Sequence, residues 1–119
     1  MIDTRLTAAE SRLGDIIWEN EPVGSGELVK LASAALGWKK STTYTILKRI
    51  TDKGIFINDG GTVRSLISKE ELFSMQSEIF VEETFHGSLP AFLAAFTKRK
   101  PLTDEEIEEL KDIIDSMRK

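Results

Sequence analysis

The sequence predicts a mostly α-helical protein with one small β-hairpin, and two observations lead to this fold class. Apolar residues recur at helical spacing in several segments, and most of these segments follow a serine or threonine that can cap a helix. Between residues 55 and 67, two short segments rich in strand formers flank the turn-forming sequence Asn58-Asp59-Gly60-Gly61-Thr62. The length of 119 residues suits one compact domain, or a small domain with an accessory arm.

Two helices are predicted at the start of the chain. The first runs from about residue 8 to residue 19, because Thr7-Ala8-Ala9-Glu10 has the spacing of a capping box. The second runs from about residue 26 to residue 36, with Ser25 as its cap. Gly37 follows it and suits the left-handed conformation that ends many helices.

A third helix is predicted from about residue 42 to residue 53, with Ser41 as its cap and Gly54 as its stop. Its inner face is a stripe of residues three and four apart, namely Thr43, Ile46, Leu47 and Ile50. The order of three helices and then a hairpin, over residues 1–68, is that of a winged helix-turn-helix domain. In such domains the third helix enters the major groove of DNA.

The outer face of this third helix carries short hydroxyl side chains beside basic ones. Hydroxyls can hydrogen-bond to base edges or phosphates, and basic side chains neutralise phosphates. Taken singly, each threonine is more simply a surface or capping residue, and the whole set is what favours DNA binding. The residues predicted to bind DNA are Lys39, Lys40, Ser41, Thr42, Tyr44, Thr45, Lys48 and Arg49, together with Arg64 in the hairpin.

The charge of the chain is unevenly distributed. The net charge is −4, yet residues 38–54 contain five basic side chains and one acidic one. A local basic patch can steer a polyanion even on an acidic protein. A solvated basic face is the plainer interpretation of charge alone.

Residues 69–119 are predicted to form three more helices, from about residue 69 to 85, from Ser88 and Pro90 to about residue 98, and from Thr103 almost to the end. They carry more apolar side chains than three short helices can bury alone, so we expect a second copy of the chain to cover them. Folding back onto the first domain is the alternative. The residues expected at the dimer interface are Leu72, Met75, Ile79, Phe80, Leu89, Phe92, Leu93, Phe96, Ile107, Leu110 and Ile114.

Several classes of protein are disfavoured by composition. The chain has no cysteine and a single histidine, His86, so it offers neither a disulfide nor a thiolate or multi-histidine metal site. It lacks a glycine-rich phosphate loop and a nucleophile with a nearby base, so we expect no catalytic residue and no cofactor. No apolar run approaches the ~18 residues of a membrane span. We therefore expect a cytoplasmic protein that does not insert into a membrane.

Three segments resemble the penicillinase-repressor family of the BlaI/MecI/CopY type, and the likeness covers nearly the whole chain. The segments are "LTAAESRLGDIIW", "WKKSTTYTILKRITDKGIF" and "LPAFLAAFTKRKPLTDEEIEELKDII". The resemblance implies a dimeric repressor that binds a palindromic operator and dimerises through its C-terminal helices. It places Ser41, Thr42 and Thr45 toward the bases and Arg49 toward the DNA backbone. It also matches Trp38 to a tryptophan just before the helix, where we expect core packing with some phosphate contact.

The resemblance also bears on how the repressor is released from DNA. Members that respond to β-lactams are cut at an Asn-Phe bond, to which Ala95-Phe96 corresponds here. The asparagine of this cleavage site is replaced by Ala95 here. A sensor protease stays among the expected partners, with Ala95-Phe96 as the bond it would cut. Copper-responsive members carry a cysteine-rich C-terminal motif, which this chain lacks. The alternative function is that of a winged-helix module that binds a protein and no specific DNA.

Overall fold

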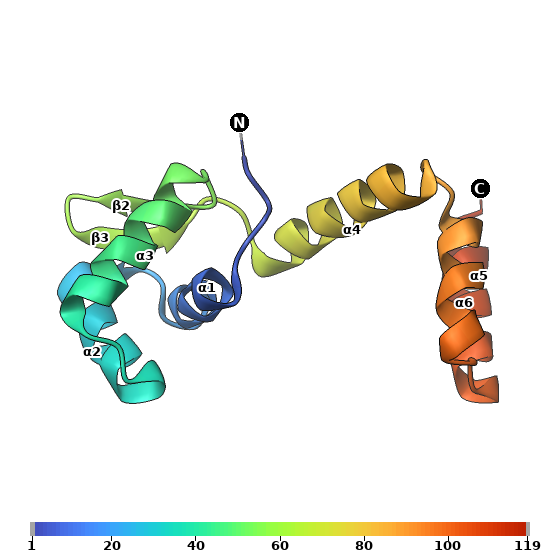
Figure 1. Ribbon diagram of the computed structural model, residues 1–119, viewed down its shortest axis with the longest axis horizontal. Coiled ribbons are helices and arrows are strands. Elements are labelled where there is room, and N and C mark those ends of the chain that lie inside the picture. Colours follow the sequence, from blue (N-terminus) through green and yellow to red (C-terminus); the bar gives the residue numbers. More distant parts are fainter. Residues whose placement is uncertain (1, 119) are drawn as a thin grey trace. The chain divides into compact units, whose positions relative to one another are not determined.

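The protein divides into two compact units in a computed structural model that describes residues 2–118 (Figure 1). The division falls between Ser77 and Glu78. It lies inside a helix and later than the predicted boundary at residue 68. We call residues 2–77 the winged unit and residues 78–118 the second unit.

The winged unit contains three helices, a three-stranded antiparallel sheet and the first half of a fourth helix, α4. Its elements are α1 (Ala8–Asn20), β1 (Val23–Gly24), α2 (Ser25–Leu36), α3 (Lys40–Asp52), β2 (Phe56–Asp59), β3 (Thr62–Ser65) and the start of α4 (Lys69–Phe85). The strand order is β1-β3-β2. The predicted fold class, a mostly helical winged helix with a small hairpin, is confirmed.

The sheet has one more strand than the sequence predicted. β1 is two residues long, and it pairs Val23 with Val63 and Gly24 with Thr62. A strand this short has no alternating pattern to detect, and it forms because β3 offers a free edge. The turn between β2 and β3 is also tighter than expected, since Gly60 and Gly61 alone form it at φ values of 60° and 95°. Such positive φ values suit glycine.

The predicted helix caps are right in part. Thr7 and Glu10 form the full capping box, because the Glu10 amide donates to the Thr7 hydroxyl at 3.1 Å and the Thr7 amide donates to the Glu10 carboxylate at 2.9 Å. The predicted Ser25 and Ser41 caps are wrong. α2 begins at Ser25 itself after Gly24, and α3 begins at Lys40 after Lys39, in both cases without a side-chain cap.

The core of the winged unit lies where α1, α2 and α3 meet the hairpin, and α4 adds one side chain to it. All four residues of the predicted inner stripe of α3 are buried, and Trp38 packs against this core. The largest fully buried apolar side chains are Phe56, Leu13, Ile17, Leu28, Ile50, Ile55, Leu72 and Val63. Leu72 therefore belongs to the core and is not available for a dimer interface, contrary to its predicted role.

Several contacts attach the start of α4 to the rest of the winged unit. Leu72 is 1% exposed in the core, and the Lys69 ammonium pairs with the Asp15 carboxylate of α1 at 2.9 Å. The Trp18 indole donates to the carbonyl of Ile67 at 3.1 Å, just before the helix. The same indole ring packs on Phe56, with the ring centroids 4.9 Å apart.

Lys53 is not part of the exposed basic face, although the sequence counted it within the basic segment 38–54. Its ammonium donates to the Glu10 carboxylate at 2.6 Å and to the backbone carbonyl of Arg5. Glu10 is 2% exposed. Burial raises the pKa of its carboxyl, but hydrogen bonds from Lys53 and Thr7 outweigh this effect, so the pKa lies below the ordinary value of 4.5.

The second unit consists of the end of α4, α5 (Leu89–Arg99) and α6 (Asp104–Ser116). Ser88 caps α5 by accepting from the Ala91 amide at 3.1 Å, and Thr103 with Glu106 forms the predicted capping box of α6. His86, at a φ of 52°, lies exposed at the break after α4. Among residues 2–118, no helix combines the length and the apolar character needed to cross a lipid bilayer.

We predict that Glu10→Gln destabilises the winged unit by about 1–3 kcal/mol at neutral pH, because the Lys53 ammonium loses a charged, buried partner. The folded-state pKa of Glu10 lies below its unfolded value, so the stabilisation is fully present above pH 4.5 and is lost as the pH falls through the lowered folded value. Urea unfolding of both proteins between pH 7 and pH 3 measures the difference. It should stay constant down to about pH 5 and then shrink.

Glu19→Gln is the matched control, since Glu19 is an exposed residue of the same helix. It should change the free energy of unfolding by less than about 0.5 kcal/mol. A Glu10→Gln protein as stable as the control at pH 7 would contradict the role of the ion pair.

Candidate nucleic-acid interface

The exposed face of α3 carries the hydroxyl and basic side chains that the sequence singled out. The buried stripe opposite this face fixes the rotation of the helix, and the predicted DNA-binding residues of α3 and Lys39 are all exposed. Part of the face is a shallow depression lined by Tyr44, Thr45, Lys48, Arg49 and Asp52. Ser41, Thr42 and Lys40 lie one turn earlier on the same helix, toward its N-terminus.

The hydroxyl groups of α3 differ in what they can still bind. The Thr45 hydroxyl donates to the backbone carbonyl of Ser41 at 2.9 Å. Its proton is used within the helix, which leaves the oxygen lone pairs free to accept. Thr43 forms the same kind of bond to the Lys39 carbonyl at 3.3 Å, but its side chain is buried and cannot meet a ligand.

The charges on this face are largely uncompensated within the described residues. Lys48 pairs with Asp52 one turn later, at 3.3 Å, and both side chains are well exposed. Lys40 lies 6.0 Å from the centre of the Tyr44 ring. No carboxylate of the described chain forms an ion pair with Lys39, Lys40 or Arg49. The face therefore keeps a positive charge that a polyanion can neutralise.

Ser25 joins this surface, a role that the sequence did not suggest because it indicated only a helix cap. The Tyr44 and Ser25 hydroxyl oxygens are 3.4 Å apart. The Ser25 amide donates to the carbonyl of Gly61, in the turn of the hairpin, at 2.8 Å. The start of α2 thus connects the face of α3 with the hairpin turn. Only the fold brings these residues together, as they are far apart in the sequence.

Arg64 stands apart from the residues that line the depression on α3. It lies on β3, where it pairs in register with Ile57 of β2, and its side chain is exposed. Asp59, at the end of β2, is exposed too. The hairpin therefore offers one basic and one acidic side chain.

The residues predicted to form a dimer interface fall in both units. Met75 is half-buried in the winged unit, near the buried Leu72 of the same helix. In the second unit, no side chain of α5 or α6 is buried, although both helices are described in full. The exposed apolar side chains of this unit are Ile79, Phe80, Leu89, Phe96, Ile107, Ile113, Ile114 and Met117.

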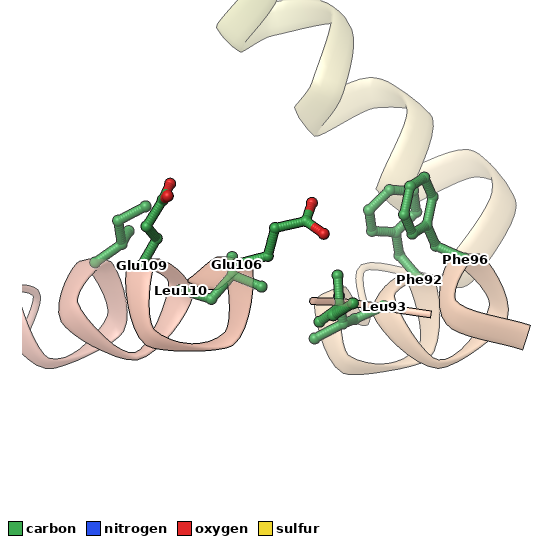
Figure 2. A pocket seen from close by; sticks show the side chains of 8 residues that line it. Phe92, Leu93, Phe96, Glu106, Glu109 and Leu110 are labelled. Atoms are coloured by element: carbon green, nitrogen blue, oxygen red, sulfur yellow. The ribbon is translucent and has the colours of Figure 1, made fainter. Parts of the chain in front are cut away.

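A groove of about 300 Å³ lies between α5 and α6. Figure 2 shows side chains of both helices around it, among them Phe92, Leu93 and Phe96 of α5 and Leu110 of α6. Phe92 is also the centre of an aromatic cluster, because its ring lies 5.7–6.0 Å from those of Phe80, Phe85 and Phe96. The lining is mostly apolar, but the side chains of Glu106 and Glu109 on α6 also belong to it.

The peptide bond between Ala95 and Phe96 lies in the middle of α5. Ala95 is exposed, and Phe96 is 46% exposed while touching the aromatic cluster. The backbone around this bond is helical, whereas exposed loops and chain ends are the preferred places for proteolytic cuts. A protease would have to unwind α5 before it could cut here.

Residues 2–118 contain no group of three or more histidine, aspartate or glutamate side chains arranged to hold a metal ion. The two conspicuous surfaces of the described chain are the basic, hydroxyl-rich face of α3 and the apolar faces of α5 and α6.

Comparison with known proteins agrees with the resemblance drawn from the three sequence segments. A model of the penicillinase repressor family matches residues 6–116. The chain is 25% identical to the penicillinase repressor of Bacillus licheniformis over 116 residues, which cover 93% of this chain and 90% of that protein. It is 22% identical to the methicillin resistance regulatory protein MecI of Staphylococcus aureus over 113 residues, which cover 92% of each.

A third relative is the penicillinase repressor of Staphylococcus aureus, with 24% identity over 118 residues that cover 96% of this chain and 94% of the relative. These similarities extend over the sequences of both units. Because the family model spans nearly the entire chain, the protein belongs to the penicillinase repressor family, a family of transcriptional repressors.

Proposed function

We propose that the protein is a dimeric transcriptional repressor that binds a palindromic DNA operator, with α3 of each copy in the major groove. The observation that carries this proposal is the outer face of α3. On it, hydroxyl side chains and uncompensated basic ones project from a helix whose opposite side is buried. An α-helix fits the major groove, and two copies of one reading helix match a sequence with two-fold symmetry.

Short hydroxyl side chains suit base reading because they let the helix approach the groove closely. Thr45 is the sharpest case. With its proton donated to the Ser41 carbonyl, its oxygen can accept a hydrogen bond from the amino group of adenine or cytosine, and its methyl group can touch thymine. Ser41 and Thr42, in the first turn of α3, are the other base-facing candidates.

The basic side chains would supply affinity rather than sequence preference. Lys39, Lys40 and Arg49 are exposed and can meet phosphates directly. Lys48 would exchange Asp52 for a phosphate, which costs little because an exposed ion pair of this kind is worth less than about 1 kcal/mol. Arg64 of the hairpin is a candidate for a further backbone contact.

Dimerisation is proposed through the second unit. Half-exposed phenylalanine, leucine and isoleucine side chains on α4, α5 and α6 leave more apolar surface than a unit of about 40 residues can hide alone. A second copy presents the same apolar surface, and in a two-fold symmetric dimer each copy covers the apolar surface of the other. The groove between α5 and α6 is a natural place for side chains of the partner.

The proposed repressor acts where the DNA is, in the cytoplasm. Release by a sensor protease at Ala95-Phe96 would break the second unit in the middle of α5 and remove α6 from the dimer interface. The helical state of that bond makes unwinding a required first step.

Selection of bound duplexes from a random pool, followed by sequencing, tests the proposal and the role of Thr45 together. The wild-type protein should enrich a palindrome. Thr45→Val removes the hydroxyl and keeps a methyl group, whereas Thr45→Ser does the reverse. Removing a good hydrogen bond to a base should cost about 1–3 kcal/mol at one position of each half-site and relax the preference there.

If Thr45→Val and Thr45→Ser weaken binding to every sequence alike, Thr45 does not read bases. If the wild-type protein retards no DNA even at low salt, the alternative of a protein-binding winged helix is favoured instead.

The salt dependence of operator binding should identify the side chains that neutralise phosphates. Arg49→Ala should reduce the slope of log K against log salt concentration by about one unit for each phosphate that is no longer neutralised, hence by about two for a dimer. Lys111→Ala is the matched control, because it removes the same charge from an exposed site on α6. Equal slopes for the two variants would rule out a bond between Arg49 and a phosphate.

Substitution in the second unit should separate dimerisation from folding. Ile114 is 51% exposed on α6, so Ile114→Glu leaves the core of the winged unit intact while it places a charge in the proposed interface. Sedimentation equilibrium should show the dimer dissociation constant rising by at least about 100-fold, since two isoleucine side chains lose their cover. Asp112→Ala, on the polar side of α6, should leave it unchanged, and an unchanged constant for Ile114→Glu would place the interface elsewhere.

A further inference from the structure

A short segment near the start of the chain forms hydrogen bonds both to the residue after α3 and to α4. The segment comprises residues 2–6, precedes α1 and forms neither helix nor strand. Thr4 is only 6% exposed, and Ile2 and Leu6 pack against the core. We call residues 2–6 the N-terminal strap.

On one side, the strap is bonded to Lys53, the residue that directly follows α3. The Asp3 amide donates to the backbone carbonyl of Lys53 at 2.9 Å. The Lys53 ammonium donates in return to the backbone carbonyl of Arg5, and at 2.6 Å to the buried carboxylate of Glu10 in α1. Lys53 thereby satisfies two backbone groups of the strap and one buried charge.

On the other side, the strap is bonded to α4. The Gln76 side-chain amide donates to the backbone carbonyl of Thr4 at 2.7 Å. Gln76 lies one turn beyond Leu72, the residue of α4 that enters the core. The strap is therefore held by Lys53 at one edge and by Gln76 at the other, with Thr4 buried between them and Ile2 and Leu6 partly buried against the core.

This arrangement matters because α4 continues without a break into the second unit, where it ends at Phe85. From Leu72 to Phe85 the helix is about 20 Å long. A tilt of about 10° at Leu72 would move its far end by about 3.5 Å, close to the rise of about 3.4 Å between base pairs along one strand of DNA. An inserted base pair also rotates one half-site relative to the other by about 34–36°. A firmly seated α4 should therefore restrict the half-site spacings that the dimer accepts, and a loosely seated one should tolerate more of them.

We propose that the N-terminal strap fixes the angle between α3 and α4, and that Lys53 and Gln76 are positioning residues which set the spacing of half-sites that the dimer accepts. The inference rests on the proposed function, since it requires a dimer that reads two half-sites. It assigns no DNA contact to either residue. The bond from Gln76 to Thr4 is a contact between a side chain and the backbone, so it can be removed without leaving a buried charge.

The test compares the affinities of purified full-length proteins for three duplexes that carry the palindrome selected by the wild-type protein. One has the natural spacing, one has a base pair inserted at the centre, and one has a single half-site. The variants are Gln76→Ala and, as the matched control, Ser74→Ala, which alters an exposed residue of the same helix. Urea unfolding checks that each variant is folded under the binding conditions.

We expect Gln76→Ala to reduce the preference for natural over lengthened spacing by about threefold to tenfold, the effect of one net hydrogen bond. Binding to the single half-site should stay within about twofold of the wild type, because α3 itself is unchanged. Ser74→Ala should keep the wild-type preference. A purely structural role of Gln76 would weaken binding to all three duplexes by the same factor and leave the preference intact.

An unchanged spacing preference in a folded Gln76→Ala protein would overturn the inference while leaving the proposed function standing. Failure of the wild-type protein and of Ser74→Ala to prefer a palindrome over a single half-site would instead refute the dimeric reading mode. The two failures are therefore distinguishable in one set of titrations.

Discussion

The burial of one side of α3 is the constraint on which the rest of this protein depends. Thr43, Ile46, Leu47 and Ile50 lie in the core against α1, α2 and the hairpin. Burying each of the three aliphatic side chains is worth about 1.5–3 kcal/mol, so their combined contribution rivals the net stability of a small domain. As long as this stripe is buried, the hydroxyl and basic side chains on the opposite side of the helix must face outward.

Basic side chains at and just after the end of α3 have two different environments. Lys48 and Arg49 are solvated and keep their charge available on the outer face, whereas Lys53, one turn later, is drawn into the structure by the buried Glu10 carboxylate. The difference comes from rotation around the helix, which turns Lys53 toward α1 and the strap. The net charge of the chain is −4, so its basic face is a local feature. Which basic side chains belong to this face depends on which of them pair with buried carboxylates.

The second unit poses a different physical problem, because its helices are well capped but poorly covered. The Thr103 capping box, the Ser88 cap and the helical spacing of apolar residues make α5 and α6 locally favourable, yet neither helix buries a side chain in the described chain. Local signals can specify that a helix forms without specifying what it packs against. This is why the sequence of this segment favours an oligomer. If the proposed dimer forms, the stability of this segment depends on the concentration of the partner chain.

The sequence by itself determined the features that rest on local chemistry. These are the six helices, the capping boxes at Thr7 and Thr103, the inner stripe of α3 and the glycine turn of the hairpin, because backbone hydrogen bonding, φ preferences and side-chain periodicity act over a few residues. Tertiary structure alone decided the pairing of β1 with β3, the burial of Leu72, the withdrawal of Lys53 from the basic face and the contact between Tyr44 and Ser25. Each of these depends on contacts between residues that are distant in the sequence, and local sequence patterns do not predict such contacts.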